Sequence, residues 1–422
     1  MQRLVKAFQS STFIRHNAIF FTGSMAIGLL NYLYYPVMGR LLHPASFGEV
    51  QVLFSLFAQI TIFLAAFGLL TVNIVTNYTD TSKRNRMISE LEKFALLISL
   101  VLLILTVVCA PFLQQFFHFG SSVPFVILML AVVLGVPTTF RGSFLRGKKM
   151  FGIVSVIGVI MAIADLVLSA VLVLAGFGTV GAISALVLAQ MAAFTYAAKR
   201  AKALGFTESL HGKLFKLPDF KLMLPELKYA SLVLVCSLTV TAMYSLDSLA
   251  VKHFFNAHVA GIYAGISTVA RIIFFLTASI VGVLIPSIKL QQKPKENQNI
   301  LQKSLILMAT IGGMAVLVFA IIPKFVIRVL MGPKYLPDAY LLPRLSLVVF
   351  IISLINLFIM YHIALRRYWV MAIVVTGFTA TIVLLVAHHQ TILAVINSLL
   401  IGSLTMLALL GVWLGIRRLQ SA

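Results

Sequence analysis

The feature that most constrains the fold is a series of long apolar segments that recurs along the whole chain. A transmembrane helix needs about 20 mostly apolar residues, because each residue adds about 1.5 Å along the helix axis. The chain is therefore predicted to be an all-α polytopic membrane protein with about 12 transmembrane helices. The segments that meet the length requirement are residues 14–39, 49–74, 92–117, 123–145, 150–175, 179–199, 228–252, 259–286, 302–323, 340–365, 368–388 and 391–416.

The composition excludes a water-soluble globular domain. Hydrophobic residues make up 61% of the chain and charged residues only 10%, whereas a soluble domain contains about 25% charged residues. The alternating apolar and polar pattern of a transmembrane β-barrel is absent. Cys109 and Cys236 lie inside predicted spans, and their spacing gives no disulfide or metal-site pattern.

The net charge of +22 is distributed unevenly between the two sides of the membrane. If the N-terminus is cytosolic, the cytosolic segments contain 26 of the 33 Lys and Arg residues, and Arg271 lies inside a span. The positive-inside rule therefore predicts that both termini are cytosolic and that the number of spans is even. This basic charge is a topology signal, so we expect no nucleic-acid partner. The outer side holds Arg40, Lys252, Lys324, Arg328, Lys334 and Arg344.

Two ungapped internal matches indicate a duplication of six helices. Residues 37–50 align with 250–263, which places Gly48 on Gly261. Residues 111–120 align with 323–332 at a nearly equal offset. Because six is even, the two halves would have the same orientation and form parallel repeats, with a site at their interface.

The longest polar break lies near the middle of the chain, after the sixth predicted span. The predicted organisation is therefore an N-terminal six-helix lobe (1–199), a cytosolic linker with an amphipathic segment (200–227) and a C-terminal six-helix lobe (228–422).

Three ionisable residues lie within predicted spans: Arg271, Asp165 and Asp247. A charge at the bilayer centre costs at least about 2.5–3.5 kcal/mol, so each needs water or a partner. Arg271 is either an anion anchor in a central cavity or the partner of Asp247, which lies about 8 Å away in depth on the preceding span. Asp165 and Asp247 are either protonatable or cation-binding sites that couple transport to a gradient, or structural hydrogen-bonding groups.

Further polar residues are candidates for weaker roles. Asn31, in the outer half of the first span, could contact a sugar or bridge to the seventh span. Arg15 and Arg141, at cytosolic ends of spans, either extend to lipid headgroups as topology determinants or capture an anionic headgroup from the inner leaflet. Gln59, Gln190 and Asn356 are expected to form interhelical hydrogen bonds.

Sequence signatures of enzymes are missing. The chain contains no H-E-x-x-H, Walker A or G-x-S-x-G motif. The longest outer segment, roughly 324–339, contains only Asp338 as an acid. We therefore expect no covalent chemistry, no metal site and no cofactor. A membrane glycosyltransferase or polymerase is the alternative from another class, and a non-transporting scaffold for glycan assembly is a third.

Four stretches together resemble a known family. They are GRLLHPASFGEVQVL (39–53), RGSFLRGKKMFGIVSV (141–156), VAGIYAGISTVARIIFFLTASIVGVLIPSI (259–288) and IPKFVIRVLMGPKYLPDAYLLPRL (322–345). Their order and spacing resemble those of the polysaccharide or O-antigen (Wzx-type) flippases of the multidrug/oligosaccharidyl-lipid/polysaccharide exporter superfamily.

This resemblance implies two V-shaped lobes around a cationic central cavity. It implies that a lipid-pyrophosphate-linked oligosaccharide crosses from the cytosolic to the outer leaflet by alternating access, during synthesis of a surface polysaccharide such as the O-antigen of lipopolysaccharide. The implied location is the bacterial inner membrane, and the implied partners are this substrate, membrane lipids and glycan-assembly proteins. Arg271, Arg15 and Arg141 are the implied cavity cations. The alternative within the superfamily is a sodium- or proton-driven exporter of drugs or small solutes, whose cavity should be acidic.

Overall fold

The computed structural model describes residues 2–206, 224–288 and 294–420, and the side chains of residues 22–206, 231–284, 287–288 and 295–412. Within these residues the fold is helical and contains no strand, which confirms the predicted all-α class. The helices of the first half are α1 (Gln2–Leu41), α2 (Pro44–Asn77), α3 (Thr81–Phe116), α4 (Val123–Gly147), α5 (Phe151–Leu172) and α6 (Gly178–Ala203). Those of the second half are α7 (Leu224–Phe254), α8 (Ala257–Ala270), α9 (Ile272–Ser287), α10 (Pro294–Ile321), α11 (Pro323–Leu330), α12 (Leu342–Ala364), α13 (Val370–Ala387) and α14 (Ile392–Gln420).

Ten helical stretches in the described part of the chain are long and apolar enough to cross a membrane. One of them, Phe151–Ala203, contains both α5 and α6. A short π-helical turn, Val173–Phe177, separates these two helices, and Gly176 and Gly178 on either side of its end have positive φ angles of 93° and 51°. The chain therefore folds back here, so that α5 packs along α6. With α1, these stretches account for all the predicted spans.

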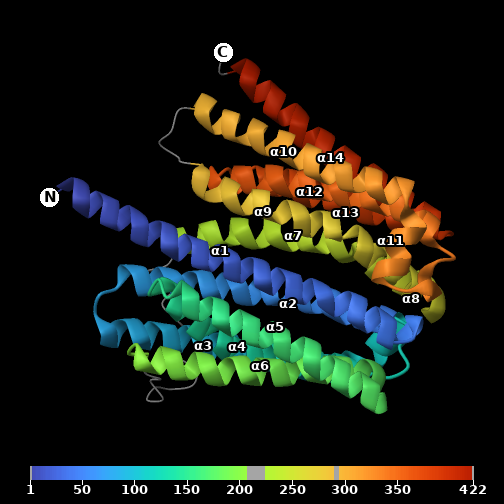
Figure 1. The fold of residues 1–422 in the computed structure, drawn as a ribbon, viewed down its shortest axis with the longest axis horizontal. Helices are drawn as coiled ribbons and strands as arrows, with labels where there is room; N and C mark the ends of the chain where they lie inside the picture. Colours follow the sequence, from blue (N-terminus) through green and yellow to red (C-terminus); the bar gives the residue numbers. More distant parts are fainter. Residues whose placement is uncertain (1, 207–223, 289–293, 421–422) are drawn as a thin grey trace. The chain divides into compact units, whose positions relative to one another are not determined.

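The chain divides into two compact units (Figure 1). Unit 1 consists of residues 1–42 and 60–230. In it α5 packs against α1 and α6, and α4 packs against α3 and α6. Unit 2 consists of residues 43–59 and 231–422. In it α12 packs against α8, α9, α10 and α14, and α13 packs against α14.

The first half of α2 belongs to unit 2, whereas the sequence-based boundary assigned it to the N-terminal lobe. The ring of Phe47 lies 6.1 Å from that of Tyr335, which follows α11 in a 3₁₀ turn (Pro333–Tyr335). Burial raises the pKa of the Tyr335 phenol above its ordinary value, so this group stays neutral. The predicted amphipathic linker falls largely on residues 207–223, which lie outside the described residues.

The two glycines that the internal match aligns, Gly48 and Gly261, contact each other in unit 2. A Cβ atom added to Gly48 would lie 3.0 Å from the Cα of Gly261, and one added to Gly261 would overlap the carbonyl oxygen of Pro44. Two positions that the internal match aligns therefore contact each other, and the contact requires the absence of a side chain at Gly261.

Gly261→Ala should therefore destabilise the protein, because the added Cβ meets backbone atoms that cannot rotate away. Overpacking of this kind costs about 1–3 kcal/mol. The midpoint of thermal unfolding of the purified protein measures the effect. Gly282→Ala is the control, because an added Cβ there has no neighbour within 4 Å. Equal midpoints for the two variants would contradict the close contact.

Candidate functional site

Arg271 lies at the junction of α8 and α9, near the middle of the membrane span Ala257–Leu284. Its N–H donates to the carbonyl oxygen of Ser267 at 3.0 Å. Its own carbonyl accepts from the N–H groups of Phe274 at 3.1 Å and Phe275 at 3.3 Å. The backbone pairing thus continues across the junction, as the hydrocarbon interior requires. The span therefore carries a guanidinium without exposing backbone groups to lipid.

The Arg271 side chain is 4% exposed and forms an ion pair with Asp247 of α7. Its Nη2 atom lies 2.7 Å from Asp247 Oδ1 and donates to Ser248 Oγ at 2.7 Å. The structure thus contains the ion pair that was one of the two sequence-based interpretations of Arg271. Because each charge compensates the other, the pair reduces the cost of placing either in the membrane interior.

The second oxygen of Asp247 is also hydrogen-bonded. Asp247 Oδ2 accepts from the hydroxyl of Tyr263 at 3.2 Å and from that of Ser267. Both donors lie on α8 and are fully buried. The carboxylate therefore has partners on both oxygens and ties α7 to α8.

An aromatic ring completes the surroundings of the guanidinium. The carbon Cζ of Arg271 lies 4.8 Å from the centre of the Tyr244 ring, close enough for a cation–π interaction. Tyr244 in turn packs against Phe274, with ring centres 4.8 Å apart. We call Tyr244, Asp247, Ser248, Tyr263, Ser267 and Arg271 the Arg271 cluster. This cluster offers one planar guanidinium to an anion. In this structure the guanidinium is paired with one carboxylate, that of Asp247.

Two glutamines of α2 extend the polar contacts of unit 2. The Thr268 hydroxyl donates to Gln51 Oε1 at 3.4 Å, and Gln59 Nε2 donates to Ser245 Oγ at 3.0 Å. The expectation that Gln59 links two helices is confirmed. Gln51 was missed, because it is followed and preceded by apolar residues and has no sequence signal of its own. These two contacts explain why the first half of α2 belongs to unit 2.

Asp165 lies on α5 of unit 1, away from the Arg271 cluster along the chain and in a different unit. Its electrostatic neighbours are Ser169, one turn further along α5, and Tyr34 of α1. Its Oδ1 atom is buried and has no hydrogen-bond partner among the described residues. A buried carboxylate oxygen of this kind can accept a proton or bind a cation.

Arg141 is held by partners within unit 1, and its role in capturing an anionic headgroup stays a prediction. It is buried on α4, forms an ion pair with Glu92 of α3, and donates to the Pro137 carbonyl at 3.0 Å. The guanidinium also lies 5.1 Å from the ring centre of Phe194 and 5.2 Å from that of Phe206. In this structure Arg141 joins helices within unit 1. It does not extend to lipid headgroups at the surface.

The remaining predicted residues are less constrained. Asn31 lies on α1 with an exposed side chain, and its role in substrate binding stays a prediction. Arg15 also lies on α1, but its side chain is outside the described residues. Among the residues that the structure describes, no group of three or more His, Cys, Asp or Glu side chains could hold a metal ion.

Several partners in these sites were missed from the sequence. Glu92 is the first residue of a predicted span, where charges are ordinarily solvated, so it was not considered as a partner of Arg141. Ser267 lies four residues before Arg271 and Ser248 directly follows Asp247. The helical spacing of Ser267 was a usable signal, because residues four apart share a face.

Residues 14–291 match the family described as "Polysaccharide biosynthesis protein". A comparison with curated protein sequences gives no match.

Three solved structures show the similarity in fold. One is described as "Lipid II flippase MurJ, inward closed conformation", with a TM-score of 0.73, 13% identity, and coverage of 93% of this chain and 86% of that chain. A second is an inward-facing multidrug resistance MATE family transporter of the MOP superfamily (TM-score 0.69, 14% identity, coverage 95% and 97%). A third is the MATE transporter VcmN of Vibrio cholerae (TM-score 0.64, 13% identity, coverage 99% and 98%). The chain therefore shares their fold.

The Arg271–Asp247 pair should show strong energetic coupling. Asp247→Asn leaves a buried guanidinium without its countercharge, and breaking a buried pair in this way costs about 3–5 kcal/mol. The double variant Asp247→Asn/Arg271→Gln removes both charges, so its midpoint of thermal unfolding should be higher than that of Asp247→Asn alone. A double variant at least as unstable as the sum of the two single variants would contradict the pairing.

Proposed function

We propose that the chain, which belongs to the polysaccharide biosynthesis protein family, is a flippase for a lipid-pyrophosphate-linked oligosaccharide. It moves this substrate from the cytosolic to the outer leaflet of the bacterial inner membrane by alternating access, with both termini cytosolic and without covalent chemistry. The observation that carries the proposal is the arginine held near the middle of a span in unit 2. A guanidinium is a planar fork of donors that fits phosphate oxygens.

The ion pair gives Arg271 a partner when no substrate is bound. In the proposed cycle a diphosphate oxygen replaces Asp247 Oδ1 beside the guanidinium, so that Arg271 is compensated in both states. The hydroxyls of Tyr263 and Ser267 continue to donate to Asp247, which keeps the released carboxylate hydrogen-bonded. The exchange keeps a negative charge beside the guanidinium at every stage, because an uncompensated Arg271 at the bilayer centre would cost at least about 2.5–3.5 kcal/mol. The charge of the displaced Asp247 is then stabilised by these two hydrogen bonds.

Other residues have proposed supporting roles. Arg15 and Asn31 on α1 are proposed to contact the headgroup and a sugar, respectively. The proposed setting is the assembly of a surface polysaccharide such as the O-antigen of lipopolysaccharide, together with glycan-assembly proteins. The family assignment and the shared fold with a protein described as a lipid II flippase support this setting.

A flipping assay with a neutralised pair tests the role of Arg271. Purified Asp247→Asn/Arg271→Gln is placed in vesicles that contain a fluorescent lipid-linked oligosaccharide, and the fraction of sugar protected from an impermeant reagent is followed over time. We expect correctly folded protein whose flipping rate is at least about tenfold lower, the effect of losing about 1.4 kcal/mol of anion binding. A normal rate would remove Arg271 from the mechanism.

Neutralising the Glu92–Arg141 pair in the same way distinguishes between Arg271 and Arg141 as the residue that binds the anion. Glu92→Gln/Arg141→Gln also removes one positive and one negative charge from a buried pair. If Arg271 binds the diphosphate, flipping is lost only in the unit 2 variant. Loss of flipping only in the unit 1 variant would assign the anion site to Arg141, another of the cavity cations that the family resemblance implies.

A cation-coupled exporter of drugs or small solutes is the second candidate function. It is favoured by the buried oxygen of Asp165, which lacks a hydrogen-bond partner among the described residues, and by the fold shared with proteins described as multidrug transporters. Efflux or flipping in vesicles with and without an imposed gradient distinguishes the two functions.

Asp165→Asn tests whether this carboxylate couples transport to a gradient. The amide cannot release a proton or supply a negative charge to a cation. We expect stimulation of transport by an imposed proton or sodium gradient to disappear, while transport without a gradient continues. Unchanged stimulation would leave Asp165 with a structural role only.

A further inference from the structure

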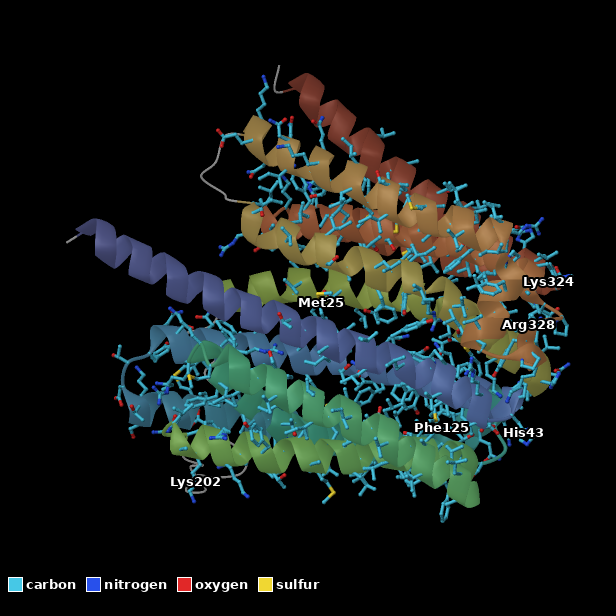
Figure 2. All side chains as sticks on the ribbon, viewed as in Figure 1. Met25, His43, Phe125, Lys202, Lys324 and Arg328 are labelled. Carbon is cyan, nitrogen blue, oxygen red and sulfur yellow. The ribbon has the colours of Figure 1, made fainter. Side chains whose placement is uncertain are left out.

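Helix α11 lies outside the membrane spans of unit 2. The span that contains α10 ends at Ile321, and the next begins at Ala339. Because α11 starts at Pro323, directly after the first of these spans, it lies at a membrane boundary. Figure 2 shows Lys324 and Arg328 together at one end of unit 2, opposite the C-terminal end of α14.

The side chains of α11 divide into four faces, because residues four apart in a helix lie above one another. Lys324 and Arg328 form an exposed basic face. Phe325 and Val329 form an exposed apolar face, at 63% and 49% exposure. Ile327 and Met331 are fully buried against unit 2 and fix the orientation of the helix.

Val326 and Leu330 form the fourth face, which is partly exposed and lies opposite the basic face. The side of α11 with Ile327 and Met331 thus faces the protein. The side roughly opposite, with Phe325 and Val329, presents apolar groups outward. The basic face points away from Val326 and Leu330. A helix that lies flat at the boundary between acyl chains and headgroups has this arrangement.

The surrounding segment is strongly basic. Residues 322–345 contain Lys324, Arg328, Lys334 and Arg344 but only one acid, Asp338. Lys324, Arg328 and Arg344 have no ion-pair partner among the described residues. The segment therefore presents unneutralised positive charge at the membrane boundary.

The topology rule does not explain this charge. The segment holds four of the six basic residues assigned to the outer side, where the positive-inside rule disfavours Lys and Arg. Tyr340, 59% exposed, adds an aromatic side chain of the kind found at membrane interfaces. These features call for a negatively charged and partly apolar partner.

We propose that α11 is an interfacial helix that binds anionic phospholipid headgroups. Phe325 and Val329 enter the upper acyl region, while Lys324 and Arg328 contact headgroup phosphates. A soluble anion would leave the apolar pair in water, and a neutral lipid would leave the basic pair uncompensated. This binding does not depend on which substrate the protein transports.

Photo-crosslinking of the full-length protein in lipid vesicles tests the proposal. A trace of photoactivatable phosphatidylglycerol, or of photoactivatable phosphatidylcholine, is added to otherwise identical vesicles, and the adducts are mapped by peptide mass spectrometry. We expect adducts of phosphatidylglycerol within residues 322–345 to exceed those of phosphatidylcholine several-fold. Each basic side chain near an anionic surface strengthens binding by roughly fivefold.

Matched variants separate the basic face from general surface charge. Lys324→Gln/Arg328→Gln should reduce the phosphatidylglycerol adducts in this segment by about one order of magnitude. Lys324→Arg/Arg328→Lys should preserve them. Lys199→Gln/Lys202→Gln, which changes two exposed lysines at the end of α6, should leave them unchanged and controls for the loss of two charges.

Three results would overturn the proposal. They are equal labelling of the segment by the two lipids, unchanged labelling in Lys324→Gln/Arg328→Gln, and removal of the adducts by soluble pyrophosphate. The last result would indicate a site for a water-soluble anion. Unfolding midpoints of all variants establish that the comparison is made between folded proteins.

Discussion

The hydrocarbon interior of a membrane offers no water to an ionised side chain, and this constraint governs two buried ion pairs in the part of the chain that the structure describes. Arg271 is paired with Asp247 in unit 2, and Arg141 is paired with Glu92 in unit 1. In each pair the two charges come from different helices. The pairs therefore also fix helix against helix, which apolar contacts alone do weakly in lipid because lipid tails are equally apolar.

The two pairs differ in their depth and in their other contacts. Arg141 is close to the end of α4, where its guanidinium lies between a carboxylate, a backbone carbonyl and two aromatic rings. Arg271 is near the middle of its span, and its contacts with Asp247 and Ser248 both involve Nη2. A charge so far from either headgroup layer gains nothing as a topology signal. This position is the reason for the proposal that Arg271 binds the anion.

Much of the fold could be predicted from the sequence, because segment length and hydropathy directly determine which helices span a membrane. The Arg271–Asp247 pair could be predicted for a similar reason, because two consecutive antiparallel spans fix the relative depth of their residues in the membrane. The Glu92–Arg141 pair was not, because both residues lie at span ends, where charges are ordinarily solvated. The assignment of residues 43–59 to unit 2 depends on tertiary contacts of Gln51, Gln59 and Gly48, which no local pattern encodes.

The placement of charge follows from the same constraint that sets the fold. Within the spans, Arg271 and Arg141 are each held by a carboxylate, so neither adds net charge to its surroundings. At the boundary next to α11, Lys324 and Arg328 have no ion-pair partner among the described residues, because headgroups and water can solvate them there. In the proposed cycle an anion that enters the span displaces a carboxylate, whereas an anion at the boundary meets charge that is already available. Binding of an anion at the boundary needs only electrostatic attraction. The proposed binding at Arg271 needs an exchange of its ion-pair partner, and only such an exchange changes a contact between α7 and α8.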